Sequence, residues 1–183
     1  MILAIDTSAG QCAVALVGDD ASVVRVKQMT RGHAEALFPM IEDVLAECSS
    51  TYDDLTKVAV CVGPGSFTGL RAGISAARGL ALGRDIPAIG VTRFEAVAAN
   101  LDKPCTVRLP GRRDTVFVQE FDTVGNALGA PRIETGEASD LLPDPLEIAR
   151  LARNRSASER PAPLYMRDAD AALPREGPPP LLD

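Results

Sequence analysis

The stretch Val58–Gly73, which reads VAVCVGPGSFTGLRAG, joins a predicted strand to a predicted helix through a glycine-rich turn. Such a turn can direct free backbone N–H groups and the positive end of the helix at one place, a geometry that suits a phosphate. The alternative is a tight connection whose glycines only supply unusual backbone angles. The turn lacks the lysine of a P-loop and the spacing of a dinucleotide fingerprint. The candidate phosphate-binding residues here are Gly63, Gly65, Ser66 and Thr68.

On both sides of this turn, the first hundred residues alternate between strand and helix patterns. Three short apolar runs, the third of them alternating, predict an antiparallel meander. Apolar residues at helical spacing then predict two long helices, the first of which contains Pro39, a residue that should delay or kink it. Thr92 and Glu95 form a capping box for a third helix. The predicted elements are strands 2–6, 11–17, 22–27, 58–62 and 86–91 and helices 33–48, 68–84 and 92–100.

The pattern becomes weaker after residue 102. Residues 105–109 and 115–122 predict two strands, and one weak helix is expected from 146 to 153. From about residue 161 the chain is rich in proline. We therefore predict an α/β fold with helices packed on a sheet, in which residues 1–102 form the N-terminal lobe and residues 103–183 a reduced second lobe.

The helix over 68–84 carries many small residues: Gly69, Ala72, Gly73, Ala76, Ala77, Gly79 and Gly83. Each glycine costs a helix up to about 1 kcal/mol relative to alanine, so such a sequence suits a helix that another backbone approaches closely. The approach is either packing within the chain's own fold or a contact with another subunit. The helix over 33–48 favours a subunit contact, because it carries more apolar area than one buried face requires. The candidate interface residues are Ala36, Leu37, Met40, Val44, Gly69, Ala72, Gly73, Ala76, Ala77 and Leu80.

A second polar cluster closes the first predicted strand. Asp6, Thr7 and Ser8 stand at its end, just before the next strand. In a two-lobed nucleotide-binding fold, a carboxylate and hydroxyl groups at this point can approach a metal-bound phosphate. The same pattern is also common in ordinary turns. We therefore keep both interpretations, a phosphate site and a simple turn.

Composition limits the partners that the chain could bind alone. It has 183 residues, 19 Lys and Arg against 25 Asp and Glu, a net charge of −6 and a pI near 4.9. Aromatic residues make up only 4%, and tryptophan is absent. A chain of this charge and composition has no general attraction for phosphate backbones and no evident platform for stacking bases. We therefore expect it not to bind nucleic acid strongly by itself.

The remaining residue types favour a cytoplasmic protein without a metal site. The N-terminus carries no basic leader, and no apolar stretch is long enough to span a membrane. The single histidine, His33, opens a predicted helix, where solvent exposure or a capping role is expected. No zinc-ligand cluster is present, and the position of His33 at the start of a helix argues against a Ser-His-Asp triad. Buried free thiols are expected at Cys12, Cys48, Cys61 and Cys105.

Several of these segments together resemble the TsaB family, also called YeaZ. The likeness is strong over residues 1–100 and patchy afterwards, and the glycine-rich motif is highly specific. The segments that carry it are Met1–Ser8, Arg31–Glu35 with Leu37 and Pro39, Val62–Arg71, Pro87 with Gly90–Thr92, and Pro163–Arg167.

This resemblance implies the two-lobed actin/Hsp70-like fold, which belongs to the ribonuclease H-like class. It also implies a noncatalytic partner of TsaD in making N6-threonylcarbamoyladenosine at position 37 of tRNAs that read ANN codons. TsaE, an ATPase, would join the complex, and TsaC would supply the activated intermediate. The resemblance further implies a homodimer in isolation, with the helices over 33–48 and 68–84 as its interface. Contact with tRNA would then be indirect, and no cofactor is expected, ATP or ADP being a weak alternative.

The chain departs from the family in its second lobe. Where relatives usually read Asp-Ala-Arg-x-Gly-Glu-Val-Tyr, residues Pro110–Phe117 have proline for the acidic residue and aspartate for the glycine. The chain is also shorter than is usual in the family. The alternative function is an enzyme, either a peptidase, as the family's former M22 glycoprotease label implies, or an ATP-binding protein.

Overall fold

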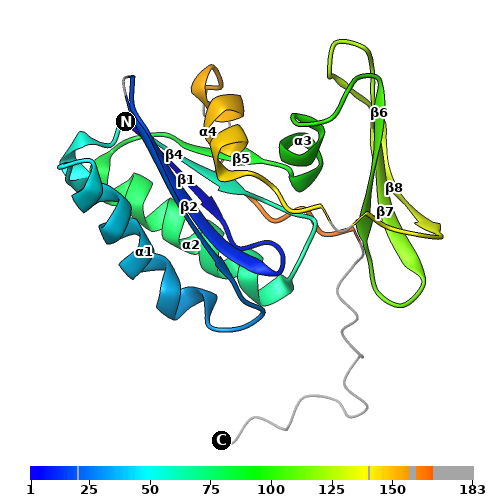
Figure 1. Cartoon of the computed structure of the whole chain (residues 1–183), viewed down its shortest axis with the longest axis horizontal. Helices are drawn as coiled ribbons and strands as arrows, with labels where there is room; N and C mark the ends of the chain where they lie inside the picture. Colours follow the sequence, from blue (N-terminus) through cyan, green and yellow to red (C-terminus); the bar gives the residue numbers. More distant parts are fainter. Residues whose placement is uncertain (20, 140, 157–159, 167–183) are drawn as a thin grey trace, which may run out of the picture.

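The computed structural model describes residues 1–19, 21–139, 141–156 and 160–166. Within these residues the chain forms two β-sheets, and helices pack against both of them (Figure 1). The prediction of a proline-rich tail falls largely outside the described residues, as does Arg167 of the C-terminal motif.

The first sheet has five strands in the order β3-β2-β1-β4-β5. Strands β1, β2 and β3 form an antiparallel meander, whereas β4 and β5 run parallel to β1. The predicted meander is confirmed. The strands span Ile2–Asp6 (β1), Gln11–Val17 (β2), Ser22–Gln28 (β3), Lys57–Cys61 (β4) and Ala88–Val91 (β5).

Helices cover both faces of this sheet because alternate residues of its strands point to opposite sides. Leu3 and Ile5 pack with α1 and α2, whereas Ile2 and Ala4 pack with α4 (Figure 1). Both faces of the central strands are therefore apolar. The helices span His33–Glu47 (α1), Phe67–Arg84 (α2), Arg93–Ala98 (α3) and Pro145–Arg153 (α4), and a 3-10 turn spans Tyr52–Asp54 (η1).

The second sheet has three antiparallel strands in the order β6-β7-β8. Helix α3 contacts it through Phe94, which packs with Val107 and Leu109. The predicted capping box of α3 is present, with Thr92 and Glu95 bonded to each other's backbone. The strands span Cys105–Pro110 (β6), Thr115–Phe121 (β7) and Ala127–Thr135 (β8).

Strand β8 and the place of α4 were not predicted. β8 is largely exposed and contains Gly129 and Pro131, so its sequence has no strand-like alternation. Helix α4 follows β8 in the chain but packs on the first sheet through Ile148, Ala149 and Ala152. The contacts of α4 therefore join the two parts of the chain, and the division at residue 102 stays a prediction.

Two expectations about α1 are wrong. The helix begins at His33 and continues through Pro39, which lies near its middle, so its regular part does not start late, whereas the alternative effect expected of Pro39, a kink, stays a prediction. His33 is only 7% exposed, and its N-cap is Gly32, without a side-chain capping bond. The reason is helical geometry, because His33 lies one turn before the buried Leu37 and on the same face of α1. Within the described residues, His33 Nε2 has no hydrogen-bond partner.

Candidate partner-binding groove

The polar cluster at the end of β1 is fully buried. Oδ1 of Asp6 accepts hydrogen bonds from the Ser8 backbone at 2.9 Å and from the Ser8 hydroxyl at 2.6 Å. Oδ2 of Asp6 accepts one from Gln11 Nε2 at 2.9 Å. The carboxylate is therefore satisfied by its own turn, and the Thr7 hydroxyl donates to the Gly69 carbonyl at 2.7 Å. These bonds support the interpretation as a turn, and binding of a metal-bound phosphate stays a prediction.

The turn before α2 has the features expected of a tight connection. The Ser66 backbone N–H donates to the Ser8 carbonyl at 2.7 Å, and the Ser66 hydroxyl caps the helix. Gly63 is buried and has a φ of 100°, a backbone angle that favours glycine. Gly65 and Thr68 are exposed. No ligand is needed to explain this turn, and phosphate binding there also stays a prediction.

Three glycines allow α2 to lie directly against the β1–β2 turn. A Cβ atom on Gly65 would overlap the Ser8 carbonyl, and one on Gly69 would overlap the Thr7 carbonyl. A Cβ atom on Gly73 would meet the Thr7 hydroxyl oxygen. This part of the small-residue pattern therefore serves packing within the chain's own fold.

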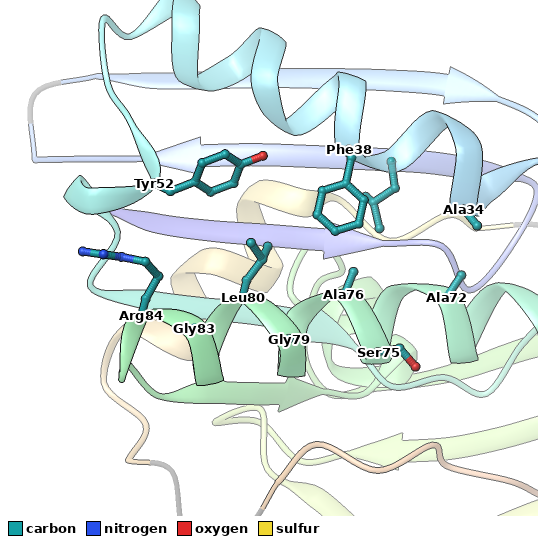
Figure 2. Close-up of a pocket in the computed structure, with 11 residues that line it drawn as sticks. Ala34, Phe38, Tyr52, Ala72, Ser75, Ala76, Gly79, Leu80, Gly83 and Arg84 are labelled. Atoms are coloured by element: carbon teal, nitrogen blue, oxygen red, sulfur yellow. The ribbon is translucent and has the colours of Figure 1, made fainter.

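Farther along α2, a groove of about 600 Å³ separates it from α1. In Figure 2, Phe38 extends from α1 toward Ala76 and Leu80 of α2, and Tyr52 of η1 lies near one end. Phe38 is 44% exposed although it is a large apolar side chain. We call this surface the α1–α2 groove. Its lining residues are Ala34, Leu37, Phe38, Tyr52, Ala72, Ser75, Ala76, Gly79, Leu80, Gly83 and Arg84.

The predicted interface residues divide between the core and this groove. The six that are buried are Leu37, Met40, Val44, Gly69, Gly73 and Ala77, and of these only Leu37 also lines the groove. The four that are partly exposed are Ala36, Ala72, Ala76 and Leu80, and of these all but Ala36 line the groove. The structure thus brings part of the predicted set together on one surface and places the rest beneath it.

Gly79 and Gly83 differ from the other glycines of α2. A Cβ atom on either residue would meet nothing within 4 Å, and both residues are exposed. Gly79, in the exposed interior of α2, costs about 1 kcal/mol relative to alanine, and Gly83, in the last turn, costs less. Packing within the described part of the chain does not explain this cost. They lie one turn apart on the edge of the groove, where a second backbone could approach closely.

Sequence analysis did not assign several groove residues to the interface. The sequence gave no sign that Ala34, Tyr52, Ser75 and Arg84 belong to an interface. Only the packing of α1 and η1 beside α2 brings these four residues together. A signal did exist for Gly79 and Gly83, whose four-residue spacing is typical of close helix pairs. Phe38 gave a second signal, because it is a large apolar residue that lies outside the apolar stripe of α1.

Arg84, at one end, is the one charged residue among those that line the groove. Arg84 Nη1 lies 2.7 Å from Asp53 Oδ1, which pairs this lining residue with a carboxylate of η1. Burial raises the pKa of Tyr52, and the carboxylate of Glu42 raises it further, so this phenol stays neutral. The groove therefore offers apolar contact along its length and a paired cation at one end.

All four cysteines are free thiols as predicted, but only Cys12 and Cys61 are buried, and the predicted burial is wrong for the partly exposed Cys48 and Cys105. Burial raises the pKa of Cys12 to about 11, with a further contribution from Asp6. Burial and Asp6 likewise raise the pKa of Cys61. Both thiols are thus protonated near neutral pH.

The described residues hold no group of three or more His, Cys, Asp and Glu side chains placed to bind a metal ion. None of the helices described is long and apolar enough to cross a membrane.

Comparison with known proteins adds sequence relatives. A family model described as TsaD, tRNA N6-adenosine threonylcarbamoyltransferase, matches residues 24–172. The tRNA threonylcarbamoyladenosine biosynthesis protein TsaB of Escherichia coli K12 is 41% identical over 97 residues, which cover 53% of this chain and 42% of that protein. TsaB of Bacillus subtilis 168 is 37% identical over 100 residues, 54% of this chain and 44% of that protein. The match thus spans less than half the length of these two relatives.

A longer match joins this chain to an uncharacterized protein of Mycobacterium tuberculosis H37Rv, with 35% identity over 172 residues, 88% of this chain and 81% of that protein. Among solved structures, a Pseudomonas aeruginosa protein with similarity to peptidase YeaZ has a TM-score of 0.79 at 23% identity and covers 91% of this chain and 99% of that one. YeaZ of the same organism has a TM-score of 0.76 at 23% identity, and the match covers 90% of this chain and 98% of that one. These structures confirm the predicted α/β fold, which this chain shares with YeaZ.

Proposed function

The chain belongs to the TsaB (YeaZ) family, and we propose that it is a noncatalytic subunit that binds TsaD through the α1–α2 groove. In this role it supports the formation of N6-threonylcarbamoyladenosine at position 37 of tRNAs that read ANN codons. The reaction takes place on TsaD, and this chain contributes a binding surface. The complex also contains TsaE and works in the cytoplasm, where tRNA is modified.

The observation that carries this proposal is the pair Gly79 and Gly83. These glycines cost the isolated helix stability, and the described packing does not use the space above them. A partner helix that crosses α2 at this point gains close backbone contact and covers the exposed side chain of Phe38. The stability that α2 loses alone is recovered in the complex.

TsaD is the proposed partner because the family model that matches this chain is that of TsaD. A related fold can present a pair of helices of its own to this pair, so that α1 and α2 of one chain pack on their counterparts in the other. In the absence of TsaD, two copies of this chain pair through the same groove. Light scattering of the isolated chain at micromolar concentration is expected to report a dimer, and a stable monomer would contradict this part of the proposal.

The proposal is tested in a strain depleted of its own TsaB that also expresses the cognate TsaD. We expect the wild-type chain to restore threonylcarbamoyladenosine in tRNA, measured by mass spectrometry of nucleosides. Phe38→Asp places a charge in the groove and is expected to abolish restoration. The matched control, Val124→Asp, makes the same kind of change at a side chain that is 82% exposed outside the groove, and it should restore fully.

Failure of the wild-type chain to restore the modified nucleoside would contradict the proposed pathway role. Equal restoration by Phe38→Asp and by the wild type would contradict the groove as the binding surface. Because Phe38 is already 44% exposed, its replacement is not expected to unfold the chain, and circular dichroism of the purified variant checks this point.

A further inference from the structure

The flank of α2 next to the groove carries a different kind of surface. The segment 160–166 runs along it and is fixed by a hydrogen bond from the Leu164 backbone N–H to the Val62 carbonyl at 2.8 Å. In Figure 1 this orange segment crosses from the first sheet toward the second. Arg160 of the segment lies beside α2, where it shares a hollow of about 450 Å³ with Arg78 and Leu82.

Two exposed aromatic rings stack at one end of this flank. The ring centroids of Phe67, in the first turn of α2, and Tyr165 lie 5.5 Å apart, with an angle of 29° between the ring planes. The guanidinium carbon of Arg71 lies 3.8 Å from the centroid of the Phe67 ring, and its Nε donates to the Tyr165 hydroxyl at 3.3 Å. Phe67 is 49% exposed and Tyr165 44%. The three groups form an exposed π-stack in a chain with few aromatic residues.

Three arginines line the same flank. Arg78 follows Arg71 by two turns of α2, about 10 Å along the axis and on the same face of the helix. Arg78 and Arg160 share the 450 Å³ hollow, where Asp85 is the one acidic lining residue. In the part of the chain that the structure describes, none of the three arginines makes an ion pair, and all three are exposed. The flank is therefore locally basic although the whole chain has a net charge of −6.

We propose that this flank, formed by Phe67, Arg71, Arg78, Arg160 and Tyr165, binds a strand of RNA. The guanidinium groups of Arg78 and Arg160 contact successive phosphates, and an unpaired base extends the stack on Tyr165 or Arg71. Basic side chains beside exposed rings are the combination by which proteins hold single-stranded RNA. The arginines alone would also suit an acidic protein segment, but the stacked rings favour a partner with flat bases.

The negative net charge sets how strongly this surface can bind. The chain as a whole repels a phosphate backbone, so binding is weak, and the contacts of the arginines with phosphates make it fall with salt. The flank therefore serves to orient an RNA that another subunit holds more tightly. It uses none of the α1–α2 groove residues, although Gly79 also borders the hollow. The proposed RNA site and the proposed binding of TsaD can consequently be tested, and contradicted, independently of each other.

The test measures fluorescence anisotropy of a labelled 12-nucleotide single-stranded RNA, and of an unmodified tRNA transcript, with the full chain at 50 and 200 mM salt. We expect Arg78→Glu combined with Arg160→Glu to weaken binding at least tenfold at the lower salt. The salt dependence should also become shallower by about 0.7 per lost phosphate contact. The control, Arg112→Glu combined with Arg113→Glu, changes the net charge equally on the turn between β6 and β7. It should leave most of the affinity intact.

A second pair of variants tests the stack. Tyr165→Ala should weaken RNA binding about tenfold, whereas Tyr165→Phe, which keeps a ring, should retain most of the affinity. Absence of binding by the wild-type chain, or equal losses in the two arginine pairs, would overturn the proposal. Binding of a poly-glutamate peptide but not of RNA would overturn it in favour of an acidic protein partner.

Discussion

At the scale of single residues, the glycines of the 63–73 motif act within the fold. Gly65 and Gly69 leave room for the backbone carbonyls of Ser8 and Thr7, and Gly69 also accepts the hydrogen bond from the Thr7 hydroxyl. The resulting contact joins the start of α2 to the end of β1. A glycine-rich turn between a strand and a helix can therefore reflect close contact between backbones rather than a phosphate site.

This account predicts the effect of adding one methyl group. Gly69→Ala should lower the free energy of unfolding by about 2–4 kcal/mol, because its Cβ would overlap the Thr7 carbonyl and the backbone can move little. Gly10→Ala is the control, because a Cβ atom there meets nothing within 4 Å. Urea unfolding measures both. An unchanged midpoint for Gly69→Ala would show that α2 does not pack tightly on the turn.

At the scale of elements, α2 has two distinct halves. Its first half packs against the β1–β2 turn through Gly69 and Gly73, and its second half presents Gly79 and Gly83 beside the α1–α2 groove. The small residues of one helix thus serve the fold at one end and, in the proposed complex, a partner at the other. Packing within the fold therefore accounts for the small residues in the first half of the helix, and contact with another subunit stays the proposal for the second half.

Replacing the two glycines in the second half of α2 by alanine is predicted to stabilise the chain. Gly79→Ala combined with Gly83→Ala should raise the free energy of unfolding of the isolated chain by about 1–2 kcal/mol, because alanine is the better helix former and the space is open. Urea unfolding at low protein concentration measures the change. A loss of stability would mean that these glycines are required by the fold itself, which would remove the main support for the partner surface.

Most elements could be predicted because their signals are local. The capping box of Thr92 and Glu95 and the apolar spacing of α1 and α2 depend on neighbours in the sequence. β8 lacked such a signal, because it lies exposed at the edge of the second sheet. The burial of His33 and the groove contacts of Phe38 were also missed, since they depend on which face of α1 meets the sheet. The motif located the candidate site on α2, but tertiary packing decided which of its residues are available.

At the scale of the whole molecule, contacts between residues that are far apart in the sequence hold the two sheets together. Lys57, at the start of β4, donates to three backbone carbonyls at the end of α4, at 2.8–2.9 Å. Arg155 then pairs with Glu95 of α3 at 2.7 Å. The first sheet, α4 and α3 are thereby fixed to one another on the face opposite α1 and α2. The α1–α2 layer takes no part in these contacts, so its outer surface is available to a partner.

The central claim, that the α1–α2 groove binds TsaD, is tested most directly by calorimetric titration of the chain with its cognate TsaD. Gly79→Leu fills the open space beside the groove without touching the core, and Ala46→Leu adds bulk at an exposed position of α1 that does not line it. The account predicts that Gly79→Leu weakens binding at least tenfold, while Ala46→Leu binds like the wild type. Equal affinity of Gly79→Leu and the wild type would contradict the claim.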